Sequence, residues 1–263
     1  MEPKTIDQLF EDAKTLAKSH PSDIGARSAL WQIFAARGEF DRARKQLDLI
    51  AQLDSSWMLE VGSCHGLIAA EENRTAIFRG SVAPTCLGSP PTWFAQIVAA
   101  LPLLAQGRSD DAMPLLRGVY ETLGARAGVL NGERFEWICD GDARLGPCLE
   151  VIVQGQLFWV PWESVRSLET REPTEIRDRL WQQAMVELTE EGPVEAFIPV
   201  RYPAPRNDSE TMARVTAWET LGSDLYLGFG QKCFVTDQAQ VGFLDVRRLQ
   251  FDSAELAQTT QTL

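Results

Sequence analysis

The hydrophobic residues of this chain change their spacing near residue 128, and this change limits the folds available to it. From Ile6 to about Tyr120 apolar side chains recur at helical spacing, and alternating β-branched residues are scarce. After Gly128 the apolar residues come in short runs rich in Val, Ile, Phe and Trp, separated by Gly, Pro, Asn and Asp. The pattern predicts an α+β chain, with helices over residues 1–124 and a mostly β part over residues 128–251.

A length of 263 residues fits two ordinary domains. We expect a tetratricopeptide-like helical domain over residues 1–127. A mostly β (α+β) C-terminal domain over residues 128–263 follows, and its polar tail from Asp252 onward is expected to be loosely held.

Two glycine and alanine pairs in the helical part indicate paired helices. Gly38 is followed five residues later by Ala43, and Gly107 by Ala112, so the pairs lie 69 residues apart. That distance is about twice the ~34-residue tetratricopeptide period. Glycine suits the corner between two antiparallel helices, and alanine suits the point where their backbones approach. We expect segments 57–72 and 73–80 to be two helices of a degenerate middle repeat. An ordinary helical bundle with chance glycines is the alternative.

The second part contains seven candidate strands and one candidate helix. The apolar residues on both sides of Gly155 alternate, which predicts a β-hairpin there. The segment "PTEIRDRLWQQAM" at 173–185 is expected to be helical. The expected strands cover residues 134–139, 148–154, 156–162, 195–202, 213–218, 226–236 and 242–251.

The acidic stretch "DGDARLGPCLE" at 140–150 has two interpretations. It matches only the first two ligands of a helix-loop-helix calcium site, although a magnesium pair held by Asp140 and Asp142 is conceivable. The other interpretation is a structural turn between two strands, because Asp side chains cap backbone N–H groups and glycine accepts a positive φ. The turn would be formed by Asp140, Asp142, Arg144, Gly146 and Pro147.

Composition excludes several other classes of protein. A formal net charge of −12 argues against binding to nucleic acid phosphates, and no segment offers the ~20 apolar residues of a membrane span. The chain is therefore expected to be cytoplasmic, with its five cysteines reduced. "LGFGQK" at 227–232 lacks the third glycine and the following helix of a dinucleotide site, so no cofactor is expected.

Taken in order, the segments resemble the ImpE family, also called TagJ, of accessory proteins encoded with type VI secretion systems. The resemblance covers nearly the whole chain. It begins with "ALWQIFAARGEFDRARKQLDLIAQLD" and "LGSPPTWFAQIVAALPLLAQGR", and it is sharpest in "FEWICDGDARLGPCLEVIVQGQLFWVPWESV". Shorter matches are "IRDRLW", "IPVRYP", "RVTAW", "GFGQK" and "LDVRRLQF".

The resemblance implies a non-enzymatic cytoplasmic adaptor. Its partner would be a helical segment of the small subunit of the contractile sheath, and it would link the sheath indirectly to the ClpV-type AAA+ ATPase. We expect the partner site in the helical part, with Trp31 and Trp57 as candidate anchors, although both could instead be buried. One alternative function is a divalent-metal-dependent enzyme that uses Asp140, Asp142 and Glu150. Another is a scaffold for an unrelated protein.

Overall fold

The structure is a computed structural model that describes residues 3–222 and 224–252. Its first part consists of helices, as predicted. The 3-10 turn η1 (Ser55–Trp57) lies between the third and fourth of them. The α-helices are α1 (Ile6–Ser19), α2 (Ile24–Ala36), α3 (Phe40–Leu53), α4 (Met58–Phe78), α5 (Phe94–Ala105) and α6 (Ser109–Thr122).

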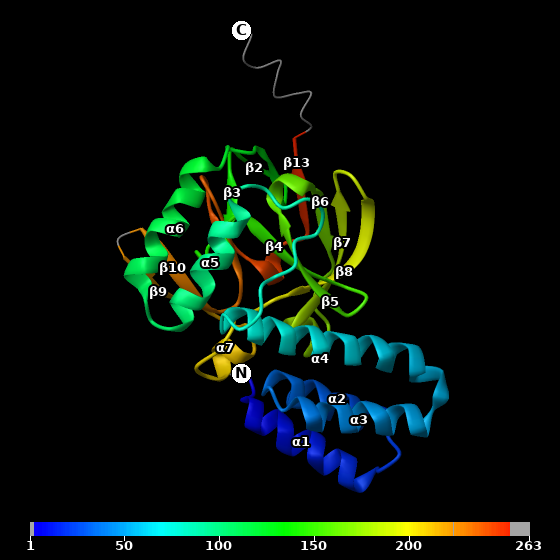
Figure 1. Cartoon of the computed structure of the whole chain (residues 1–263). Coiled ribbons are helices and arrows are strands. Elements are labelled where there is room, and N and C mark those ends of the chain that lie inside the picture. Colours follow the sequence, from blue (N-terminus) through cyan, green and yellow to red (C-terminus); the bar gives the residue numbers. More distant parts are fainter. Residues whose placement is uncertain (1–2, 223, 253–263) are drawn as a thin grey trace.

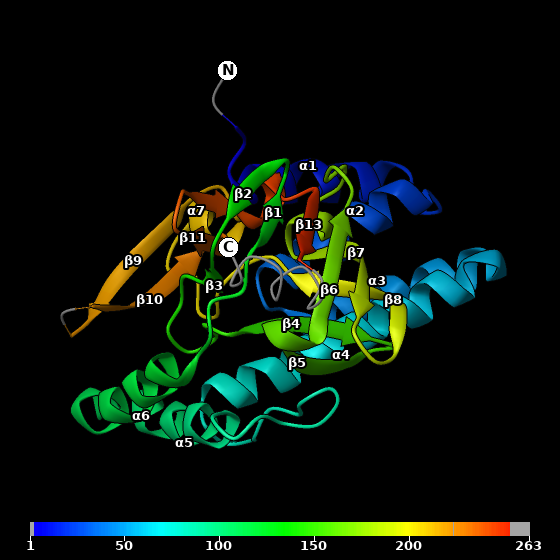
Figure 2. The ribbon, with the colours of Figure 1, turned by 90° about the horizontal axis from the view of Figure 1, so that it is seen from above.

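The two glycine corners lie at equivalent turns. Gly38 joins α2 to α3 with a φ of 73°, and Gly107 joins α5 to α6 with a φ of 72°. Ala43 and Ala112 are each fully buried where the paired helices meet. Two helical hairpins are therefore present. They do not stack directly on one another, because α4 lies between them (Figures 1 and 2).

The prediction of a two-helix middle repeat is wrong. Residues 58–78 form the single helix α4, which runs without a break for 21 residues. Gly66 in this helix lies against the β-hairpin turn at Gly155. A Cβ on Gly66 would lie 2.9 Å from the Gly155 Cα atom. The two glycines therefore let α4 approach the sheet closely.

Strands dominate the second part. The short elements among them are the 3-10 turns η2 (Trp162–Ser164), η3 (Arg177–Arg179) and η4 (Phe243–Asp245) and the helix α7 (Asp208–Thr211). The strands are β1 (Gly128–Leu130), β2 (Glu133–Phe135), β3 (Ile138–Asp140), β4 (Cys148–Val153), β5 (Gln156–Pro161), β6 (Val165–Thr170), β7 (Trp181–Leu188), β8 (Gly192–Pro199), β9 (Thr216–Leu221), β10 (Leu225–Gly230), β11 (Cys233–Thr236), β12 (Gln240–Gly242) and β13 (Arg248–Phe251).

The strands form three antiparallel sheets. The largest has eight strands in the order β2-β1-β13-β6-β7-β8-β4-β5, and a three-stranded sheet has the order β12-β11-β3. The β9–β10 pair is a separate hairpin that projects from the other strands (Figure 2). The predicted β4–β5 hairpin is present, with Gln154 and Gly155 at its turn in positive φ.

The prediction of a helix at 173–185 is wrong. The segment contains the short turn η3 and then enters strand β7, whose residues alternate between buried and more exposed positions. Pairing with β6 on one side and β8 on the other holds the segment extended in spite of its local helix propensity. The expected strand at 134–139 is divided into β2 and β3, and the one at 226–236 into β10 and β11.

Two hydrophobic cores lie on opposite faces of the large sheet. Ile152 and Trp159 point toward the helices and share a core with α1–α6. The alternate residues Val151 and Val160 belong to a second core among the strands. The helices and the sheet thus share one of the two cores across the predicted domain boundary.

Three further sequence expectations concern the whole chain. The five cysteines are free thiols, of which Cys64, Cys148 and Cys233 are buried. None of the helices in the described part of the chain combines the length and apolar composition needed to cross a bilayer. The expected loose tail, beyond Asp252, lies outside the described residues.

Candidate functional site

The acidic stretch forms a hydrogen-bonded turn between β3 and β4. The backbone N–H of Asp140 donates to the Gly146 carbonyl oxygen at 2.8 Å, and the N–H of Asp142 donates to Asp140 Oδ1 at 2.9 Å. Gly146 has a φ of 37°, and a Cβ there would lie 2.1 Å from the Tyr120 hydroxyl oxygen. Glycine is therefore required at this position. Pro147 then leads into β4.

Arg144 closes this turn through its side chain. Its Nε donates to Asp142 Oδ1 at 2.9 Å, and its Nη2 donates to Asp142 Oδ2 at 2.5 Å. This is the two-point pairing that suits a guanidinium and a carboxylate. Asp142 is fully buried, and its Oδ2 also accepts the backbone N–H of Gly228 in β10 at 2.7 Å. The turn is thereby fastened to the β9–β10 hairpin.

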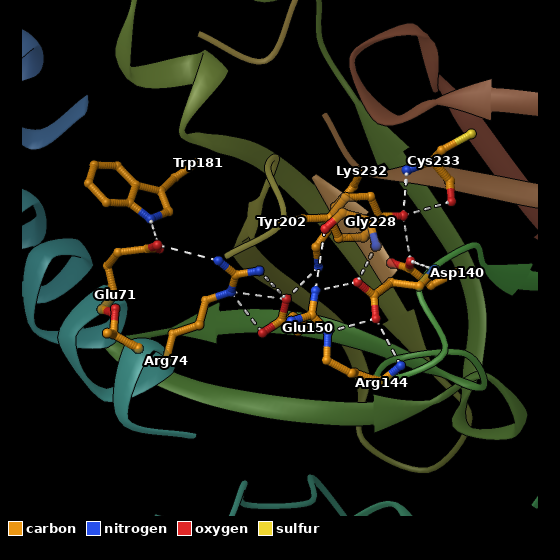
Figure 3. A network of polar contacts seen from close by, with 12 residues as sticks. Glu71, Arg74, Asp140, Arg144, Glu150, Trp181, Tyr202, Gly228, Lys232 and Cys233 are labelled. Carbon is orange, nitrogen blue, oxygen red and sulfur yellow. Dashed lines mark hydrogen bonds and ion pairs between the residues drawn. The ribbon is translucent and has the colours of Figure 1, made fainter. Parts of the chain in front are cut away.

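Glu150 forms a buried cluster with two cations from distant parts of the sequence. Arg74 of α4 donates from Nε to Glu150 Oε1 and from Nη2 to Oε2, each at 2.9 Å. Lys232, between β10 and β11, donates from Nζ to Glu150 Oε2 at 2.5 Å. The three side chains are at most 1% exposed, and they join α4 to the sheet (Figure 3).

The cations of this network occupy the carboxylate oxygens that a metal would need. Arg74 and Lys232 bind Glu150, and Arg144 binds Asp142, so a divalent ion would be placed among buried positive charges. Within residues 3–222 and 224–252, no group of three or more His, Cys, Asp or Glu side chains is placed to hold a metal ion. The geometry favours a structural network over the metal-dependent enzyme considered from the sequence.

Two of the buried carboxyl groups of the network, those of Glu150 and Asp140, have pKa shifts of opposite sign. Burial acts to raise the pKa of Glu150, but the positive charges of Arg74 and Lys232 outweigh it and lower the pKa to about 2. For Asp140 burial dominates and raises the pKa to about 7, although Lys232 opposes it. Asp140 Oδ1 also accepts the Tyr202 hydroxyl at 2.7 Å. The two carboxyl groups therefore titrate in separate pH ranges.

An open cavity of about 1040 Å³ lies beside the acidic turn, and we call it the aromatic groove. It is bounded by the start of α5, the segment that follows α6, strand β3 and the start of β10. Two of its rings are well exposed, Trp137 at 40% and Tyr226 at 44%. Its aromatic lining consists of Trp93, Tyr120, Trp137, Trp162, Trp218, Tyr226 and Phe251. A rimmed apolar hollow of this kind is typical of an interaction site.

The charged groups of the aromatic groove differ in whether they are free to contact a partner. The Arg126 guanidinium is held by the backbone carbonyl oxygens of Trp162 and Val165 and lies 4.2 Å from the centre of the Phe251 ring. Glu163 on the same lining is exposed. The groove therefore presents negative charge at its rim, while its arginine is engaged by the protein.

The two tryptophans predicted as partner anchors lie in different environments. Trp31 is 3% exposed and belongs to the helical core, so it offers no surface to a partner. Trp57 is 39% exposed. It belongs to an exposed apolar set at the turn from α3 to α4, which we call the corner patch: Leu53, Trp57, Met58 and Leu59. This patch lies at the end of the helical layer, away from the sheet (Figure 1).

Sequence reasoning missed Arg74, Lys232 and the aromatic groove. Arg74 stands in a helix with many charged neighbours, and nothing local distinguishes it from a surface arginine. The groove combines side chains from segments more than a hundred residues apart. The eight tryptophans were the one available signal, because tryptophan can form a ligand-stacking surface as well as a core.

Comparisons with known proteins agree with this architecture. A family model described as "ImpE protein" matches residues 132–250. The type VI secretion system accessory component TagJ of Pseudomonas aeruginosa is 33% identical over 253 residues, which cover 95% of this chain and 89% of that protein. The crystal structure of protein VPA1032 from Vibrio parahaemolyticus matches with a TM-score of 0.87 at 23% identity, over 95% of this chain and 96% of that one. The structural match shows a shared α+β fold.

Proposed function

This chain belongs to the ImpE/TagJ family, and on that basis we propose that it is a non-enzymatic cytoplasmic adaptor of a type VI secretion system. The adaptor binds a helical segment of the small subunit of the contractile sheath. In this way it assists the handling of the sheath by a ClpV-type AAA+ ATPase.

The aromatic groove is the observation that carries the proposal. An amphipathic helix binds by placing its apolar face in a hydrophobic groove, and aromatic side chains commonly supply most of the binding energy. A hollow of about 1040 Å³ is large enough for several side chains of such a face. Trp137 and Tyr226, the exposed rings, are the expected anchors.

Charge complementarity defines the partner helix further. Glu163 is exposed on the groove lining, Arg126 is already engaged, and the chain carries a formal charge of −12. A helix with basic residues beside its apolar face would be attracted to this surface and oriented by it. An acidic helix of equal apolar area would bind more weakly.

The corner patch is a second surface that an adaptor of this kind can use. Met58 is 64% exposed and Leu59 is 88% exposed, beside the half-exposed Trp57. These side chains are exposed at the turn between α3 and α4 and line neither cavity, so the patch suits insertion into a pocket of a partner better than capture of a helix. Trp57 therefore remains a proposed partner contact, but on a surface separate from the aromatic groove.

Binding of the sheath small subunit to purified variants tests both assignments. Trp137→Ala and Tyr226→Ala are each expected to weaken binding by at least ~2 kcal/mol, which is about thirtyfold in Kd, with little change in melting temperature. Trp57→Ala probes the corner patch in the same assay, because that ring is similarly exposed but lies outside the groove.

Each outcome discriminates between parts of the proposal. Loss of binding in Trp57→Ala alone would place the sheath contact at the corner patch. The proposal that the chain binds the sheath would still stand. Absence of binding by the unmodified chain at tens of micromolar would reject the adaptor function itself.

A further inference from the structure

A second cavity, of about 580 Å³, has a charge opposite to that of the whole molecule, and we call it the arginine pocket. It lies between the α2–α3 corner, the C-terminal half of α4 and the segment from Arg201 to Thr211. Its carboxylates are Glu71 and Asp208. Against these two acids it is lined by Arg37, Arg74, Arg79, Arg144 and Arg201. Such a concentration of arginine is unexpected in a chain with a formal charge of −12.

Three of these arginines are already paired with acids. Arg74 binds Glu150 and Glu71, and Arg144 binds Asp142. Arg37 pairs with Asp7 at the protein surface. Among the described residues, Arg79 and Arg201 form no ion pair, although the Glu71 carboxylate acts on Arg201 through its charge.

Arg201 is the more unusual of the two because it is buried. Arg201 is only 6% exposed, and burial lowers the pKa of its guanidinium group. Its Nη1 donates to the carbonyl oxygens of Ala36 at 2.9 Å and Thr211 at 2.7 Å, the last residues of α2 and α7. These carbonyl groups lie at the negative ends of helices and compensate only part of a full charge.

The remaining donors of Arg201 face the pocket. Its Nε and Nη2 have no hydrogen-bond partner among the described residues. Neither atom is among the fully enclosed side-chain atoms that lack a partner in the described part of the chain. Both therefore keep access to the open space of the arginine pocket, whose mouth also carries the exposed Arg79.

We propose that the arginine pocket binds a phosphate group, with Arg201 at its floor and Arg79 at its mouth. Nε and Nη2 of one guanidinium form a fork that matches two oxygens of a phosphate, and a second arginine can bind a third oxygen. A carboxylate has only two oxygens and would satisfy one of the two cations less well. The pocket is larger than inorganic phosphate, so it also has room for the organic part of a phosphate ester.

Titration of the full chain with inorganic phosphate tests the proposal. Melting temperature and calorimetric heat are measured in sodium phosphate and in sodium chloride of equal ionic strength. We expect a saturable rise in melting temperature with phosphate only. A parallel titration with ADP distinguishes a phosphate ester from free phosphate, since tighter binding of ADP would show that the rest of the pocket contributes.

Two substitutions and one control connect the effect to the site. Arg79→Gln is expected to weaken phosphate binding about tenfold, the loss of one charged hydrogen-bond donor, without lowering the melting temperature in chloride. Arg201→Lys keeps the charge but removes the fork, so it should weaken phosphate binding at least as much. Arg171→Gln, at an exposed arginine outside the pocket, should leave binding unchanged.

The proposal is overturned if phosphate and chloride have the same effect, or if Arg79→Gln binds phosphate as the unmodified chain does. The second result would leave Arg201 as a cation that only holds the ends of α2 and α7 together. If Arg201→Lys does not fold, Arg79→Gln decides the question. Binding to the sheath subunit is measured separately and does not affect this test.

Discussion

Replacing Glu150 with glutamine tests how strongly the buried ion network stabilises the fold. The substitution preserves the shape of the side chain and removes the negative charge that faces Arg74 and Lys232. Both cations are 1% exposed, so water cannot compensate either charge. Within the described part of the chain no other carboxylate forms an ion pair with Lys232, which would remain buried and positive.

The expected loss can be derived in two ways. Removing one partner of a buried ion pair typically costs about 3–5 kcal/mol. The Glu150 pKa is lowered from 4.5 to about 2, and at roughly 1.4 kcal/mol per pH unit this difference corresponds to about 3 kcal/mol of stability at neutral pH. We therefore expect Glu150→Gln to reduce the free energy of unfolding by about 3–4 kcal/mol at pH 7.

Urea denaturation followed by tryptophan fluorescence measures this difference. Glu169→Gln is the control, because that carboxylate is 55% exposed and lies 3.4 Å from Arg248, so its loss should cost less than about 1 kcal/mol. Since the Glu150 pKa is depressed, its contribution is present above pH 4.5 and is lost as the pH falls toward about 2. A difference below about 1 kcal/mol at pH 7, or one that does not shrink between pH 5 and pH 3, would refute the reasoning.

Three further substitutions probe the turn and the helix contact. Arg144→Ala removes the guanidinium that pairs with the buried Asp142 carboxylate and should lower the free energy of unfolding by about 3 kcal/mol. Arg134→Ala is the control, because that side chain is 60% exposed, and it should cost less than about 1 kcal/mol. Equal effects of the two substitutions would contradict this prediction. Because the Asp140 pKa is raised from 3.8 to about 7, its carboxyl destabilises the fold as the pH rises through that range. Asp140→Asn should therefore be neutral or stabilising at pH 8, and greater destabilisation at pH 8 than at pH 5 would be the opposite result. Gly66→Ala should destabilise by about 1–3 kcal/mol in thermal or urea unfolding, because its Cβ would lie 2.9 Å from the Gly155 Cα atom; a gain from better helix propensity would show that α4 can move away.

Features of the fold that depend on local sequence were predictable. Hydrophobic spacing predicted the helical and strand parts, and Gly38 and Gly107 predicted two helix corners that the structure contains. Alternation around Gly155 predicted the β4–β5 hairpin. In each case the residues that determine the structure are neighbours in the chain, so their pattern can be read directly.

Features that depend on long-range pairing were not predictable. Strand β7 has helix-compatible residues such as Gln183 and Ala184, and only its two neighbouring strands make it extended. The candidate sites show the same limit. The acidic turn was accessible to sequence reasoning, but the partners of Glu150 come from positions 74 and 232, which no local pattern connects.

The position of β13 in the large sheet has a consequence for synthesis of the protein. Residues Arg248–Phe251 lie between β1 and β6, so the last strand in the described part of the chain joins the first strands of the sheet to the rest. The ribosome must therefore release the chain as far as Phe251 before β1, with β2 paired to it, can join the other strands. A translation product that stops before Arg248 would expose two unpaired strand edges and the second core, and cellular proteases and chaperones would treat it as unfolded.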